Sequence, residues 1–126
     1  MKNKIAVLFE INKNLKLIQS PVPEIQEGQL LIKLKFTSIC RSQIMEIDGK
    51  RGKDIWLPHQ LGHEGSGIVK KIGKNVTLFK PNDEVIITWI KTEGINANGT
   101  SIKYKKYTIL VMNTDSLMSN RIRFIY

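Results

Sequence analysis

The sequence predicts a mainly β protein, built as a closed or nearly closed barrel. Apolar residues occur in short runs that alternate with polar residues, as in strands that bury one face. Turns rich in Gly, Pro and Asn separate these runs, a pattern typical of barrels. No amphipathic pattern in the 126 residues extends over three helical turns, and this length fits a single domain with its own core.

The expected elements follow one another along the chain. A hairpin turn is expected at residues 12–14, and Pro21 and Pro23 predict an extended segment without regular pairing. A short helix is expected at residues 41–47, followed by a polar loop. The expected strands are residues 4–9, 15–18, 30–39, 67–72, 83–90, 104–111 and, after a polar stretch at 113–120, the terminal residues 121–126.

Residues 30–39 give the clearest strand signal. Ile32, Leu34 and Phe36 alternate with polar side chains, so these three are expected to point toward the core together. If Phe36 is buried in this way, its replacement by Ala costs on the order of 3–5 kcal/mol.

Charge and hydropathy narrow the classes of function. The net charge of +9, from 20 basic and 11 acidic residues, would suit nucleic acid, but the lysines are dispersed and form no basic block. No nucleic-acid partner is therefore expected. No apolar run is long enough to span a bilayer, and the first one stops at Phe9, too early for a secretory signal. These features predict a cytoplasmic protein without a membrane partner.

The stretch LGHEGSGIVKKIG, residues 61–73, allows two interpretations. Gly65 and Gly67 could begin a phosphate-binding loop, but strand-like residues follow them where such a loop needs a helix. Alternatively, His63 and the only cysteine, Cys40, lie beside the ends of expected strands, and both residue types bind zinc. Glu64 could add an oxygen ligand or support a ligand. The spacing alone still favours an ordinary buried Cys and a turn His.

Several segments resemble the zinc-containing medium-chain alcohol dehydrogenases. GHEGSGIVKKIGKNVTLFKPNDEV is similar to that family's G-H-E-x-x-G signature and to the strand and K-P-G-D-x-V turn that follow it. TSICRSQIMEIDG is similar to the family's G-I-C-x-S-D segment, in the same order and at about the same separation. The resemblance covers residues 1 to about 91. It implies a GroES-like, partly open β-barrel with short helices.

The resemblance also implies roles for the matching residues. Cys40 and His63 would bind one catalytic zinc ion, and Glu64 would be a catalytic carboxylate able to approach the metal as a further ligand. Ser42 would take the proton of the alcohol, and Arg41 would contact the coenzyme pyrophosphate. The implied protein is a zinc-dependent oxidoreductase that uses NAD or NADP on a small-molecule alcohol or aldehyde, and that is a homo-oligomer when complete.

The sequence departs from the family pattern at several positions. Gln43 stands where the family usually has Asp, and Met45 stands where some members have a proton-carrying His. Asn82 replaces a turn glycine, a mild change because Asn tolerates a positive φ. No cysteine occurs between Trp89 and Tyr104, so no structural zinc is expected. Residues 1–126 would be an incomplete N-terminal domain, without the third zinc ligand and the coenzyme-binding domain, and inactive by itself.

Other functions remain as alternatives. The chain could be a GroES-like scaffold or binding module without catalysis, or a degenerate gene fragment. Cys40 and His63 together disfavour the zinc-free quinone-reductase branch of the same superfamily. The second histidine, His59, has no obvious partner in the sequence and is expected at the surface.

Overall fold

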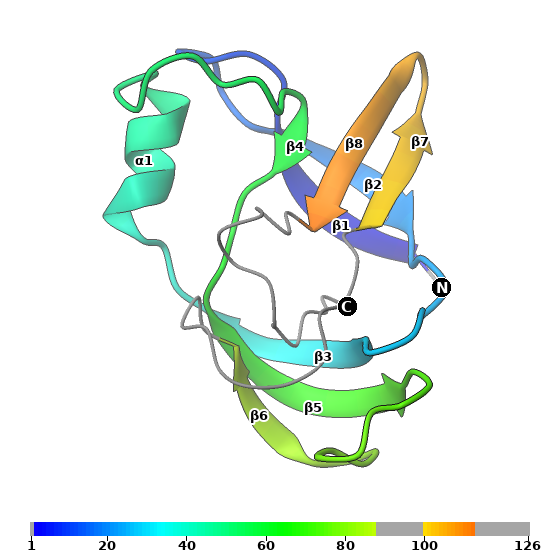
Figure 1. The fold of residues 1–126 in the computed structure, drawn as a ribbon. Coiled ribbons are helices and arrows are strands. Elements are labelled where there is room, and N and C mark those ends of the chain that lie inside the picture. Colours follow the sequence, from blue (N-terminus) through cyan, green and yellow to red (C-terminus); the bar gives the residue numbers. More distant parts are fainter. Residues whose placement is uncertain (1, 88–99, 113–126) are drawn as a thin grey trace. The chain divides into compact units, whose positions relative to one another are not determined.

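The computed structural model describes residues 2–87 and 100–112, which divide between two compact units. The described residues of the first unit are 2–23, 39–62 and 100–112, and those of the second are 24–38 and 63–87. The described residues are mainly β, with one short helix (Figure 1). Each unit is described by itself below.

The first unit is built on a five-stranded sheet. Its strands are β1 (Lys2–Leu8), β2 (Lys16–Pro21), β4 (His59–Gln60), β7 (Thr100–Tyr104) and β8 (Tyr107–Met112), in the order β2-β1-β4-β8-β7. β1 pairs antiparallel with β2 and with β4, β4 pairs parallel with β8, and β7 and β8 form a hairpin. The helix α1 (Arg41–Ile47) belongs to this unit, and its last residue accepts a hydrogen bond of 2.6 Å from the backbone N–H of Asn12.

The core of the first unit follows from strand alternation. Alternate residues of β1, Ile5 and Val7, point to the same side and are buried together with side chains of β2, β7 and β8. An aromatic cluster packs against this core, with Phe9 meeting Tyr107 edge to face at a centroid distance of 5.1 Å. The buried apolar cluster consists of Ile5, Val7, Ile18, Ile102 and Ile109.

The second unit contains a three-stranded antiparallel sheet, β3 (Leu30–Thr37), β5 (Gly65–Ile72) and β6 (Glu84–Ile87), with β5 in the middle (Figure 1). Leu30, Ile32 and Val69 are buried. At Gly67 of β5, an added Cβ would lie only 2.3 Å from the carbonyl oxygen of Lys33. β3 and β5 therefore approach so closely that only glycine fits at this position.

Most predicted elements are present at nearly the expected positions. The helix has the predicted bounds, 41–47, and Asn12 and Asn82 have positive φ values of 59° and 76° in the turns where tolerance of such angles was expected. β2 extends further than predicted, to Pro21. The expectation that Pro21 lies outside regular pairing was therefore wrong, because it pairs with Lys2. Because β2 is an edge strand, the missing N–H of proline is tolerated there. Residues 88–90 and 121–126 of the predicted strands, and the predicted polar stretch 113–120, lie outside the described residues.

Two expectations about single side chains were wrong. Phe36 is 75% exposed, although Ile32 on the same strand is fully buried. The pairing of β3 with β5 shifts register between Leu31 and Ile32 and again between Leu34 and Phe36, and these irregularities interrupt the simple alternation. His59 was expected at the surface but is only 5% exposed, in β4 between β1 and β8.

The described residues are mainly β, as predicted, but they do not form a closed barrel. The five-stranded sheet has two edges there, so it does not form a closed barrel, although its edge strands β2 and β7 are in contact. One helix is described where short helices were expected. That helix has seven residues, and none of the described part of the chain forms a helix that could cross a membrane.

Candidate metal centre

Cys40 is positioned by the first turn of the helix α1. It is the residue before the first helical one, with an extended backbone (φ −81°, ψ 143°). Its carbonyl oxygen accepts a hydrogen bond of 3.0 Å from the backbone N–H of Gln43, and its own N–H donates to the side-chain oxygen of Gln43 at 2.8 Å. These bonds satisfy groups that a helix terminus otherwise leaves without partners. The backbone of Cys40 is therefore held in a defined geometry.

The two residues after Cys40 carry the polar groups that the sequence singled out. The hydroxyl of Ser42 donates to the sulfur of Cys40 at 3.3 Å, and both side chains are partly buried. Arg41 is exposed at the first position of the helix. The hydroxyl of Ser42 is thus within hydrogen-bonding distance of the thiol of Cys40.

His63 and Glu64 lie immediately before β5. Gly62 precedes them with a φ of 121°, an angle that favours glycine. Since Thr37 at the end of β3 pairs with Gly65 at the start of β5, the residues just beyond these ends are neighbours. Strand pairing therefore brings Ser38, the residue after β3, close to Glu64.

Glu64 is held by the last residue of β3 and by the residue that follows it. Its Oε2 accepts a hydrogen bond of 2.6 Å from the hydroxyl of Ser38, and its backbone oxygen accepts one of 2.9 Å from Thr37. Its Oε1 lies 3.7 Å from Nε2 of His63. Both side chains of this pair are about one-third exposed, so a dissolved ion can reach them.

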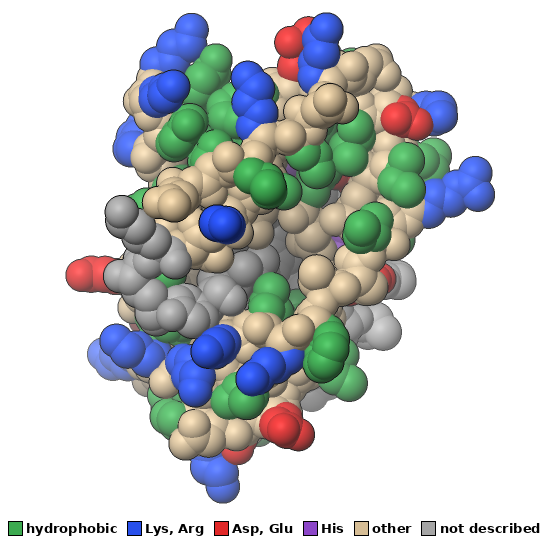
Figure 2. All heavy atoms as spheres, turned by 180° about the vertical axis from the view of Figure 1, so that it is seen from behind, with side chains coloured by type: hydrophobic (Ala, Val, Ile, Leu, Met, Phe, Trp, Pro, Cys, Tyr) green, Lys and Arg blue, Asp and Glu red, His purple; other side chains and the backbone are tan. Residues whose placement is uncertain are grey.

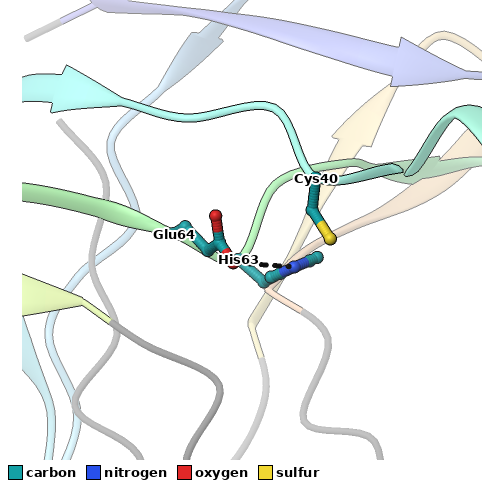
Figure 3. Close-up of side chains that lie close together, drawn as sticks. All are labelled: Cys40, His63 and Glu64. Carbon is teal, nitrogen blue, oxygen red and sulfur yellow. Dashed lines mark ion pairs between the residues drawn. The ribbon is translucent and has the colours of Figure 1, made fainter. Parts of the chain in front are cut away.

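Cys40, His63 and Glu64 form a candidate metal-binding group. One ligand atom from each residue lies within 4.8 Å of the ligand atoms of the other two. Figure 3 draws these three side chains, and its dashed line marks the ion pair between His63 and Glu64. Sulfur, imidazole nitrogen and carboxylate oxygen are the three donor types that zinc accepts in proteins. The donor set therefore fits a zinc ion.

The glycines of this region allow the close approach of two strands and do not form a phosphate-binding loop. Gly65 and Gly67 belong to the strand β5, whereas a dinucleotide-binding loop leads into a helix. An added Cβ at Gly65 would lie 2.9 Å from the carbonyl oxygen of Phe36. The interpretation of residues 61–73 as a phosphate loop therefore finds no support in the local structure.

Two residues next to this group hold its members in place, and sequence reasoning missed Ser38 and the hydrogen bonds of Gln43, which it had noted only as a replacement for the family's Asp. Ser38 holds the carboxylate of Glu64, and Gln43 holds the backbone of Cys40. The C-x-x-Q spacing at the predicted helix start could have indicated Gln43, since Gln at the third helical position is typical of a capping box. Ser38 gives no comparable signal, because its partner lies 26 residues away.

Basic side chains are dispersed on the face of the molecule that Figure 2 draws. On the face drawn in Figure 2, Lys and Arg side chains lie in several places, interspersed with hydrophobic and acidic ones. Three lysines in the first unit lie over aromatic rings, including Lys16 at 5.4 Å from the centroid of Phe9.

Comparison with known proteins identifies the family. Residues 26–113 match the alcohol dehydrogenase GroES-like domain. The S-(hydroxymethyl)glutathione dehydrogenase of Synechocystis sp. is 36% identical over 86 residues, which cover 68% of this chain and 23% of that protein. The enzyme of the same name from Escherichia coli O1:K1 matches with the same identity and coverage.

Solved structures agree with this assignment. Benzyl alcohol dehydrogenase from Acinetobacter calcoaceticus has a TM-score of 0.58 at 30% identity, over 67% of this chain and 23% of that one. Zinc-dependent alcohol dehydrogenase 2 from Streptococcus pneumonia has a TM-score of 0.61 at 26% identity, over 70% of this chain and 25% of that one. The chain spans about a quarter of the length of these relatives. It belongs to the family of alcohol dehydrogenase GroES-like domains.

Proposed function

We propose that this chain is the zinc-binding catalytic domain of a zinc-dependent alcohol dehydrogenase that uses NAD or NADP. The observation that carries the proposal is the convergence of Cys40, His63 and Glu64, whose ligand atoms lie within 4.8 Å of one another. A scaffold has no need for a thiol, an imidazole and a carboxylate at one place. The matching relatives named as dehydrogenases support the same reading.

Cys40 and His63 are proposed to hold the zinc ion, with Glu64 as the third donor on this chain. The bond from Ser38 to one carboxylate oxygen of Glu64 leaves the other oxygen directed at the His63 side. A bound zinc ion would supply a Lewis acid for the oxygen of a small alcohol or aldehyde.

Ser42 is proposed to accept the proton of the alcohol. Its hydroxyl lies 3.3 Å from the sulfur of Cys40, within reach of a substrate oxygen near that sulfur, as a general acid–base group requires. Arg41, exposed beside it, is proposed to contact the pyrophosphate of the coenzyme.

A zinc titration tests this proposal. We expect the wild-type chain to bind zinc in competition with a chelating dye, and Cys40→Ser and His63→Ala to bind much more weakly. Glu84→Ala, which removes an exposed carboxylate on β6, is the matched control and should bind like the wild type. Equal affinity in all four proteins would overturn the proposal and favour a GroES-like module without a metal.

A further inference from the structure

Gln43 is a buried amide in the first turn of α1. Gln43 is only 9% exposed, and it is the one buried residue of this helix. A buried amide costs free energy unless its polar atoms are hydrogen-bonded. Its partners therefore show what the side chain does in the fold.

The partners of Gln43 are the two backbone groups of Cys40. The side-chain oxygen of Gln43 accepts from the N–H of Cys40 at 2.8 Å, and the backbone N–H of Gln43 donates to the carbonyl oxygen of Cys40 at 3.0 Å. The backbone N–H and the carbonyl oxygen of Cys40 are thus both hydrogen-bonded to Gln43, three positions further along the chain. This fixes the direction in which the Cys40 side chain leaves the backbone.

The other end of the same amide faces the segment that leads into His63. The nitrogen of Gln43 lies 3.9 Å from the position that a Cβ at Gly62 would occupy. Gly62 directly precedes His63 in the sequence and has a φ of 121°. An amide suits this place because it has an oxygen that accepts from Cys40 and an NH₂ group that can donate on its other side.

We infer that Gln43 is a positioning residue that holds Cys40 ready to bind a metal before the metal arrives. This inference rests on the proposed zinc site. Groups that orient metal ligands in this way typically contribute 10- to 100-fold to metal affinity.

Substitutions at Gln43 test the inference through metal affinity. Gln43→Met fills the same buried space without the amide, so we expect its zinc affinity to fall by roughly 10- to 100-fold. Gln43→Glu keeps an oxygen that can accept from Cys40 and should restore most of the affinity. Ile44→Ala, at an exposed position of the same helix, should bind like the wild type. If Gln43→Met binds zinc as tightly as the wild type, the inference is wrong.

Amide hydrogen exchange at Cys40, measured by NMR without metal, separates this inference from the proposed function. The N–H of Cys40 should exchange slowly in the wild type and in Gln43→Glu, and fast in Gln43→Met. If the wild type binds no zinc but shows this pattern, the proposed function fails and the positioning role stands. Equal exchange rates in the wild type and Gln43→Met would overturn the positioning role whether or not zinc binds.

Discussion

His59 and Asp54 show how a single side chain can be misjudged from its sequence neighbours. Nε2 of His59 lies 2.8 Å from Oδ2 of Asp54, and their side chains are only 7% and 12% exposed. Asp54 also accepts a hydrogen bond of 2.9 Å from the backbone N–H of Trp56. This buried pair attaches the loop before β4 to the five-stranded sheet. It has a structural role within the first unit.

Removing Asp54 should destabilise the protein. In Asp54→Ala the buried ring of His59 loses its partner, so we expect the free energy of unfolding to fall by about 1–3 kcal/mol. Lys50→Ala is the control, because it breaks an exposed ion pair with Asp48 that is worth less than about 1 kcal/mol. Urea denaturation of the three proteins gives the comparison. A loss in Asp54→Ala no larger than in the control would contradict a structural role for the pair.

The helix α1 and the strand β3 mark what local sequence does and does not determine. The helix was predicted with its observed bounds, and its first turn is capped by Gln43 and Cys40, which are only three positions apart. β3 was predicted too, but the register shifts that turn Phe36 outward depend on its pairing with β5. The separate strand β7 was missed because the turn between it and β8 uses Lys105, at a φ of 52°, and lysine is no turn signal.

The irregular pairing of β3 makes two similar positions respond differently to mutation. Ile32→Ala should lower the free energy of unfolding by about 2–5 kcal/mol, since Ile32 is fully buried. Phe36→Ala should change it by less than about 0.5 kcal/mol, since Phe36 is mostly exposed. Thermal or urea unfolding of both variants checks this. A larger loss for Phe36 than for Ile32 would mean that the observed burial of β3 is incorrect.

The close approach of β3 and β5 gives a second prediction for this sheet. In Gly67→Ala the new methyl group would overlap the carbonyl oxygen of Lys33, so we expect a loss of about 1–3 kcal/mol in the free energy of unfolding. Ser66→Ala changes the neighbouring position of the same strand without adding volume and serves as the control. Equal stability of Gly67→Ala and the wild type would show that the strands are further apart than described.

For the whole molecule, sequence spacing alone could not establish the metal site. Cys40 and His63 are 23 positions apart, and this spacing matches no recognised zinc-finger motif. Within the second unit, the pairing of Thr37 with Gly65 places Ser38 beside Glu64, and within the first unit Gln43 holds the backbone of Cys40. The resemblance to the dehydrogenase family assigned Cys40, His63 and Glu64 together, whereas the residues that hold them in place became visible only in the structure.

The 126-residue chain by itself should not oxidise alcohols with NAD or NADP. Its sequence contains no G-x-G-x-x-G segment between a strand and a helix, so it offers no recognised site for the coenzyme. Absorbance of NADH at saturating alcohol checks this, with Cys40→Ala as the blank. Turnover above that blank would contradict this prediction.

The central claim is that the sulfur of Cys40 and the imidazole of His63 bind one metal ion. Cobalt(II) tests it most directly, because a cobalt–thiolate bond absorbs light and reports the sulfur ligand itself. We expect the wild-type chain to develop this charge-transfer band on titration with cobalt, and His63→Ala to need far more cobalt for the same band. Cys40→Ser should bind without the band or not at all. Absence of the band in the wild type, or an identical titration in His63→Ala, would contradict the claim.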